Sequence, residues 1–101
     1  MLFELDYGSK VVDKYIDFDI DFEMPLEDQY HLLKEDLIQI TYDDNHILDV
    51  GWYPEFSESG RFVVTVVRNL DWGEPIFREE CSDLPLLMKC LLKCIKRIGA
   101  S

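Results

Sequence analysis

Apolar and polar residues alternate strictly between Tyr15 and Met24. Alternation over this length is typical of a β-strand with one buried face and one face toward solvent. Every residue at the polar positions is acidic, and these residues are Asp17, Asp19, Asp21 and Glu23. The pattern predicts a strand that carries a row of carboxylates and ends before Pro25, because proline cannot donate to a β-ladder. The same row also fits a solvated edge strand that uses charge to prevent aggregation.

Further segments have strand patterns. Residues 37–42 and 46–53 flank a turn of Asp and Asn residues, so we expect them to form a hairpin. Gly51 lies inside the second segment, which indicates a bulge or a close approach of another part of the chain. Residues 61–69 are almost continuously apolar, which indicates a central strand buried on both faces. Shorter strands are expected at residues 1–6 and 76–80.

A helical pattern begins near residue 84, where apolar residues recur every three or four positions. These residues are Leu84, Leu87, Met88, Leu91, Ile95 and Ile98. Ser82 is the expected N-cap of this helix and Gly99 its expected C-cap. Basic residues line the opposite, solvated side: Lys89, Lys93, Lys96 and Arg97.

These elements predict an α+β fold in a single domain over residues 1–101. The expected architecture is a mainly antiparallel sheet of four to six strands, with a long C-terminal helix packed on one face and a short helix near residues 25–35. Nearly half of the residues are apolar (48%), which is enough for a core without disulfides or metal. No apolar run approaches the roughly 20 residues of a membrane span, and the start does not read as a secretory signal. We therefore expect a cytoplasmic protein.

The net charge of −11 is unevenly distributed along the chain. Residues 1–60 hold 16 acids and 3 bases, whereas residues 61–101 hold 5 acids and 7 bases. This excess of negative charge argues against nucleic acid or an anionic membrane as the direct ligand. It favours a basic protein partner, because complementary fields accelerate encounter and select partners.

The metal-binding residue types do not have the spacing of a known metal site. Cys81, Cys90 and Cys94 match no zinc-ligand spacing, so we expect free thiols in or near the core. The acids at 17, 19 and 21 resemble the start of a calcium-binding loop, but Phe22 stands where such a loop needs glycine. We predict no metal and no cofactor.

Catalytic motifs are also lacking in the sequence. His31 and His46 have no nucleophile and orienting partner at a recognisable spacing, so we predict that the protein is not an enzyme. One alternative stays open, a small ligand-binding or enzymatic domain with a pocket near His46, Asp49 and Trp52. A homo-oligomeric structural module is a further possibility.

Aromatic residues in or beside loops are candidate interface anchors. Tyr30, Trp52 and Trp72 lie near acidic residues, and aromatic side chains dominate many binding sites. Trp52 follows Gly51 and fits equally well as a residue that packs inward.

Three short segments resemble small bacterial immunity proteins. They are Asp49-Val50-Gly51-Trp52-Tyr53-Pro54-Glu55, Gly60-Arg61-Phe62 and Asp71-Trp72-Gly73-Glu74-Pro75. The likeness is to proteins encoded beside polymorphic toxins, notably the CdiI proteins of contact-dependent growth inhibition, and it covers roughly residues 47–77. It implies a cytosolic protein that binds one cognate toxin domain and blocks it. Many such toxins are nucleases.

Charge and resemblance lead to one hypothesis about binding. A nuclease domain that handles phosphates is basic, so its inhibitor should be acidic and should cover the active site or the substrate-binding face. We expect the acidic strand face, the acids of residues 25–36 and the turn at 43–44 to form one negative surface, with aromatic anchors beside it. The candidate partner-binding residues are Asp17, Asp19, Asp21, Glu23, Glu27, Asp28, Tyr30, Asp43, Asp44, Trp52 and Trp72.

Overall fold

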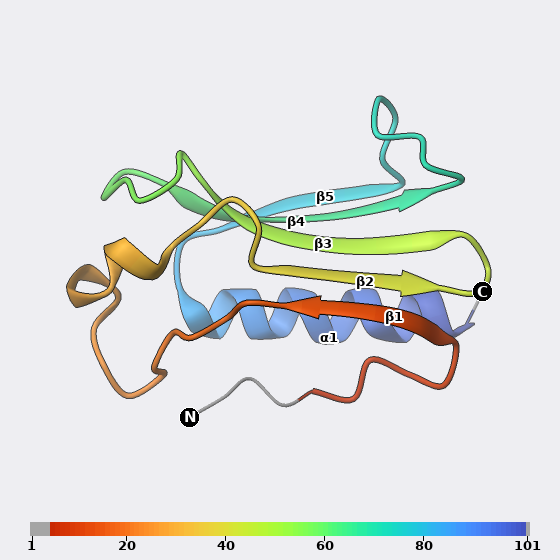
Figure 1. Ribbon diagram of the computed structural model, residues 1–101, viewed down its shortest axis with the longest axis horizontal. Helices are drawn as coiled ribbons and strands as arrows, with labels where there is room; N and C mark the ends of the chain where they lie inside the picture. The colour runs from red at the N-terminus through yellow and green to blue at the C-terminus, as the bar shows by residue number, and fades with distance from the viewer. Residues whose placement is uncertain (1–4, 101) are drawn as a thin grey trace.

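Each strand pairs with the next strand along the chain, so the sheet has the order β1-β2-β3-β4-β5 and is antiparallel throughout. The computed structural model describes residues 5–100, and Figure 1 shows one long helix along one face of this sheet. The fold is therefore α+β, as predicted. The elements are β1 (Val11–Ile16), β2 (Ile38–Tyr42), β3 (His46–Tyr53), β4 (Arg61–Arg68), β5 (Phe77–Cys81) and α1 (Leu84–Ala100), with two 3-10 turns at Leu26–Asp28 and Tyr30–Leu32 in place of the expected short helix.

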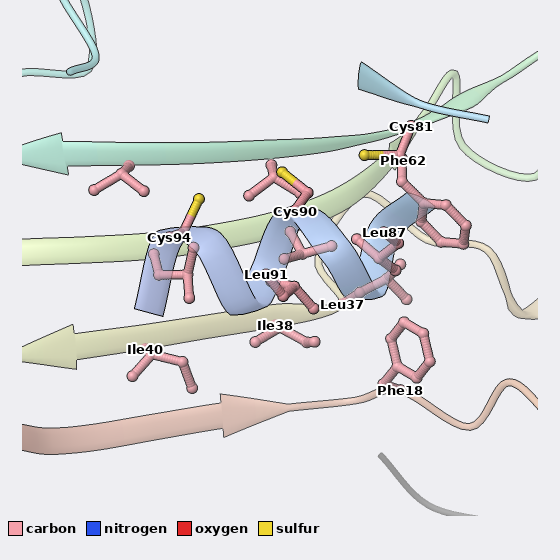
Figure 2. Close-up of a cluster of buried hydrophobic side chains, with 14 of the residues drawn as sticks. Phe18, Leu37, Ile38, Ile40, Phe62, Cys81, Leu87, Cys90, Leu91 and Cys94 are labelled. Carbon is pink, nitrogen blue, oxygen red and sulfur yellow. The ribbon is translucent and has the colours of Figure 1, made fainter. Parts of the chain in front are cut away.

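The core lies between the sheet and α1, and alternation along the strands determines which side chains enter it. The ladder aligns Ile40 with Leu48 and Leu48 with Val66, and all three side chains are buried. Leu87 and Leu91 project from α1 into the same layer (Figure 2). Buried apolar area of this kind is the main source of stability in a domain of this size.

As predicted, β4 is an interior strand of the sheet, between β3 and β5, and it is buried on both faces. Phe62, Val64 and Val66 are buried on the helix side, and Val63 and Val67 are buried on the opposite side. The loop at residues 69–76 rises on that opposite side in Figure 1. We call the sheet face away from α1 the open face.

The start of α1 differs from the prediction by one residue. The Leu86 N–H donates to Asp83 Oδ1 over 2.9 Å, so Asp83 is the capping side chain and not Ser82. An aspartate here also lies against the positive end of the helix dipole. Gly99 lies within the helix and is not its C-cap.

The predicted strand over residues 15–24 is wrong beyond Ile16. The last β-type bond runs from the Asp17 N–H to the Leu37 carbonyl (2.8 Å), and the chain then leaves the sheet. Phe18 and Ile20 are nevertheless buried, because this extended segment packs across the end of the core, where Phe18 stacks on Phe62 at 6.4 Å. The alternation therefore reports burial of an extended segment without a neighbouring strand.

Gln29 takes the place of that missing neighbour. Its side chain is buried, its Oε1 accepts the Asp21 N–H at 2.7 Å, and its Nε2 donates to the carbonyls of Asp21 (2.9 Å) and Met24 (3.2 Å). A single amide side chain thus satisfies both backbone groups of Asp21, as a strand would. We call this arrangement the Gln29 clamp.

Gly51 marks a close approach, as its position in β3 indicated. A Cβ atom at this residue would overlap the carbonyl oxygen of Glu35. The chain between the second 3-10 turn and β2 runs alongside β3, where the Trp52 N–H donates to the Lys34 carbonyl at 2.8 Å. Only glycine lets the two backbones lie this close.

The strand expected at residues 1–6 is not confirmed. Residues 1–4 lie outside the described part of the chain, and Leu5 and Asp6 belong to no strand.

Candidate functional site

Acidic residues gather at the end of the sheet where β1 stops and β2 begins (left in Figure 1). Residues 17–36 hold eight acids and one lysine. The loop after β3 brings Glu55 and Glu58 to the same end, where the Phe56 N–H donates to the Leu33 carbonyl at 2.8 Å. We call residues 17–36 with Glu55 and Glu58 the acidic end.

The turn at residues 43–44 does not belong to this surface. Register pairs Ile16 with Ile38 at the acidic end and Val11 with Tyr42 at the other, and the turn follows Tyr42. Figure 1 shows it at the opposite end of the sheet, near the C-terminus. The expectation of one continuous negative surface that includes Asp43 and Asp44 is therefore wrong, because β2 separates the two groups by its whole length.

Within the acidic end, the carboxylates differ in their surroundings. Asp17 accepts a hydrogen bond from Lys34 Nζ at 2.6 Å, and this contact raises the pKa of Lys34. Asp21 Oδ1 accepts the Glu23 N–H at 2.8 Å, so this acid helps to shape its own turn. Four candidate acids of this end are exposed to solvent: Asp19, Glu23, Glu27 and Asp28.

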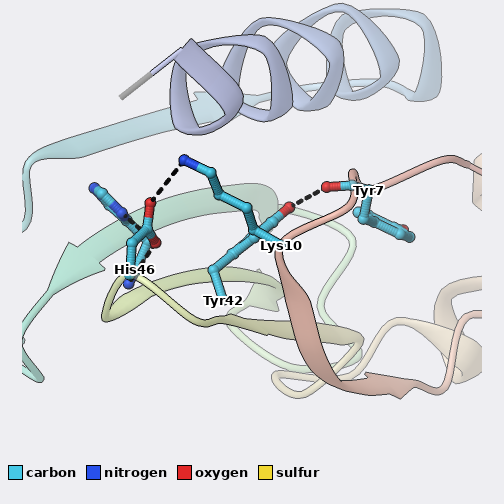
Figure 3. Close-up of polar contacts among 5 residues, drawn as sticks. Tyr7, Lys10, Tyr42 and His46 are labelled. Carbon is cyan, nitrogen blue, oxygen red and sulfur yellow. Dashed lines mark hydrogen bonds and ion pairs between the residues drawn. The ribbon is translucent and has the colours of Figure 1, made fainter.

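At the other end, Asp44 contacts two basic groups of its own chain, Lys10 and His46, which are labelled in Figure 3. Its carboxylate lies 2.8 Å from His46 Nδ1 and 3.8 Å from Lys10 Nζ. Burial acts to raise the pKa of Asp44, but the hydrogen bonds and charge of His46, together with the charge of Lys10, outweigh it and lower that pKa. Asp44 is thus engaged within the fold, whereas Asp43 is exposed.

The candidate aromatic residues occupy three different environments. Trp52 is only 2% exposed, stacks edge-on with Phe62 at 4.9 Å and donates from Nε1 to the Ser57 carbonyl. It is a core residue, and its expected role as a surface anchor is wrong. Tyr30 is half-buried, and the centroid of its ring lies 6.2 Å from that of the Trp52 ring. Trp72, in the loop after β4, is 47% exposed.

The alternative pocket near His46, Asp49 and Trp52 does not form. Side chains alternate along β3, so His46 and Trp52 turn toward α1 while Asp49 lies on the open face. Asp49 lines two hollows on the open face, His46 lines a different one beside α1, and Trp52 lines none of these three.

The open face carries a row of polar side chains that the sequence did not single out. Register places Tyr15 opposite Gln39, Gln39 opposite Asp49, Asp49 opposite Thr65, and Thr65 opposite Arg78. These five residues, one from each strand, form what we call the polar row. A signal was present in β2, β3 and β4, where Gln39, Asp49 and Thr65 interrupt largely apolar runs, but only the register reveals that the five residues line up.

Two hollows meet at Asp49 in the polar row. One, of about 330 Å³, is lined by Tyr15, Asp36, Ile38, Gln39 and Asp49, and we call it the sheet-face hollow. The other, of about 270 Å³, lies toward Trp72 and Arg78. Burial raises the pKa of Asp49; a hydrogen bond from Gln39 opposes this shift, and the charge of Asp36 adds to it.

The three cysteines are free and buried, as expected. The fold also brings Glu79 to Cys81 and Cys90, with their ligand atoms within 4.8 Å of one another, which the sequence spacing did not reveal. Lys93 Nζ lies 3.2 Å from the Glu79 carboxylate. An ammonium group in this place already neutralises the carboxylate and disfavours a second cation there.

Comparisons with models of known protein families, with curated proteins and with solved structures found no match to this chain. Among the residues that the structure describes, no helix has the length and apolar character required to cross a membrane.

Proposed function

We propose that this chain is an immunity protein that binds a cognate basic toxin domain, such as a nuclease, and covers its active site or substrate-binding face. The observation that carries the proposal is the acidic end. Its segment 17–36 has a net charge of −7, since eight acids are offset by one lysine, out of −11 for the chain. Several of its acidic residues are exposed, and the segment that carries them lies at one end of the sheet (Figure 1).

The physical reason is competition for positive charge. A nuclease holds phosphates with lysine and arginine side chains, so a surface of carboxylates meets the same groups that the substrate would meet. Opposite fields also raise the association rate, by up to about a thousandfold at low ionic strength. An inhibitor that must act before the toxin reaches its substrate benefits directly from such a rate.

The fold supports the proposal by holding the acids in place. The Gln29 clamp and the burial of Phe18 and Ile20 tie the acidic segment to the core at several points. Preorganised charges lose less entropy on binding than charges on a free tail.

The test is binding to the toxin-like domain encoded next to this gene, measured by stopped-flow or biolayer interferometry. The Asp19→Lys/Glu27→Lys double variant should slow association at least about tenfold at low salt, and the difference should shrink as salt rises. The matched control is Asp6→Lys/Asp43→Lys, which makes the same charge change at two exposed residues away from the acidic end. Equal slowing by both variants, or no binding of the neighbouring domain by the unaltered protein, would contradict the proposal.

A further inference from the structure

We propose that the sheet-face hollow binds a guanidinium group, and that it receives an arginine side chain of the basic partner. The assignment of the arginine to the partner rests on the proposed function, whereas the guanidinium site itself does not. The proposal begins from the side chains that line the hollow, which are two carboxylates (Asp36 and Asp49), one amide (Gln39) and one phenol ring (Tyr15). No basic side chain of the described residues is part of this lining.

The carboxylate of Asp49 lacks a cation of its own. It is half-buried on β3, and its hydrogen bond from Gln39 Nε2 is long at 3.4 Å. Among residues 5–100, no lysine, arginine or histidine forms an ion pair with Asp36 or Asp49. A partly desolvated carboxylate without a counter-charge is unfavourable, and a bound cation removes that cost.

The basic residue of the polar row, Arg78, pairs with another carboxylate, that of Glu80. Arg78 lies two strands away from Asp49, which is roughly 10 Å at the spacing of neighbouring strands. Its Nη1 donates to Glu80 Oε2 at 3.2 Å. Along the polar row, Arg78 therefore lies on one side of Asp49 and the sheet-face hollow lies on the other. The charge of Arg78 does not neutralise the carboxylates of the hollow.

The shape of the hollow favours a guanidinium over other cations. Tyr15 and Asp49 flank Gln39 in the register, so a flat group above Gln39 meets a carboxylate on one side and a ring on the other. Guanidinium binds a carboxylate through two parallel N–H bonds and stacks on aromatic rings. A hard divalent ion needs six or more oxygen ligands in close array, which two carboxylates, an amide and a phenol do not supply.

The polar groups of the hollow are positioned before any ligand arrives. Tyr15, Gln39 and Asp49 project from three hydrogen-bonded strands, and Asp36 follows directly on the segment that Gly51 admits against β3. Tyr15 is 49% exposed, so its ring is accessible to a stacking group.

The experiment uses N-acetyl-arginine amide as the probe, titrated into the ¹⁵N-labelled protein and followed by NMR. N-acetyl-citrulline amide, which has the same shape without the charge, is the control ligand. We expect saturable shifts at Tyr15, Gln39 and Asp49 with the arginine probe and at least fivefold weaker binding of citrulline. Asp49→Asn should weaken arginine binding at least fivefold, whereas Asp13→Asn, an exposed carboxylate on the same face of β1, should change it less than twofold.

Equal binding of the two probes, or arginine shifts that leave Tyr15, Gln39 and Asp49 unmoved, would overturn the assignment. Tyr15→Leu is a second variant that keeps the apolar bulk but removes the ring, and unchanged arginine affinity in both variants would have the same meaning. Because the probe is a small molecule, this result does not depend on finding a toxin. If arginine binds here but Asp49→Asn leaves toxin binding unchanged, the hollow exists and its assignment to the partner fails.

Discussion

The Gln29 clamp gives the sharpest prediction about stability. Gln29→Ala removes side-chain hydrogen bonds of 2.7, 2.9 and 3.2 Å, and a long one of 3.5 Å to the Pro25 carbonyl, from a residue that is 2% exposed. Each such bond contributes about 1 kcal/mol net, and the Asp21 N–H loses its partner, whereas the Asp21 carbonyl keeps only a long bond from the Met24 N–H (3.4 Å). We expect the free energy of unfolding to fall by about 2–3 kcal/mol, which corresponds to a decrease in Tm of about 10–20 °C for a domain of this size.

Urea denaturation followed by tryptophan fluorescence measures this change. Gln39→Ala is the matched control, because Gln39 is exposed and makes one long hydrogen bond, so its removal should change the unfolding free energy by less than about 0.5 kcal/mol. Equal effects of the two substitutions would refute the reasoning. A Gln29→Ala protein as stable as the unaltered one would also refute it, because water would then replace the hydrogen bonds of the clamp without loss of stability.

Three further predictions concern single residues. Gly51→Ala should lower the unfolding free energy in urea by about 2–3 kcal/mol, because the added Cβ overlaps the Glu35 carbonyl, and an unchanged value would contradict the close approach. Asp49→Asn should raise the free energy of unfolding at pH 7, because the raised pKa of Asp49 means that its charged form is disfavoured in the fold. This gain should vanish below pH 3.8, the pKa of the carboxyl in the unfolded chain, and a gain that persists there would argue for another cause. Phenolate absorbance should show Tyr7 and Tyr42 ionising at about pH 12, since burial raises the pKa of both, and Tyr42→Phe should remove one of these late titrations.

The elements with long, strongly periodic patterns were predictable from the sequence. Residues 46–53 and 61–68 form strands, and residues 84–100 form the helix, because their apolar spacing matches a sheet or helix packed on a core. Gly51 was predictable for a similar reason, since glycine inside a strand has few causes other than close approach. The pairing of β2 with β3 then follows from the short turn between them, whereas residues 17–37 separate β1 from β2.

The region around residues 17–25 was not predictable from the same pattern. Alternation reports which side chains are buried, and Phe18 and Ile20 are buried, but it does not report whether a neighbouring strand exists. That neighbour is replaced by the side chain of Gln29, whose role depends on a turn eight residues further on. Ser82 and Asp83 both suit a helix cap, and only the three-dimensional start of α1 distinguishes them.

The candidate site was partly predictable. Composition indicated an acidic surface, and the acidic end contains most of the residues named from the sequence. The separation of Asp43 and Asp44 from that end depends on the direction of β2, which charge counts do not contain. The polar row was hidden for a related reason, because residues such as Tyr15, Asp49 and Arg78 become neighbours only through register across several strands.

The order of the elements also bears on synthesis. All five strands leave the ribosome before α1, so hairpins between successive strands can begin to close while translation continues. The apolar side of this nascent sheet has no cover until α1 arrives, and uncovered apolar surface on a partly made chain invites aggregation. A chain that stops short of residue 84 should therefore be retained by chaperones or precipitate.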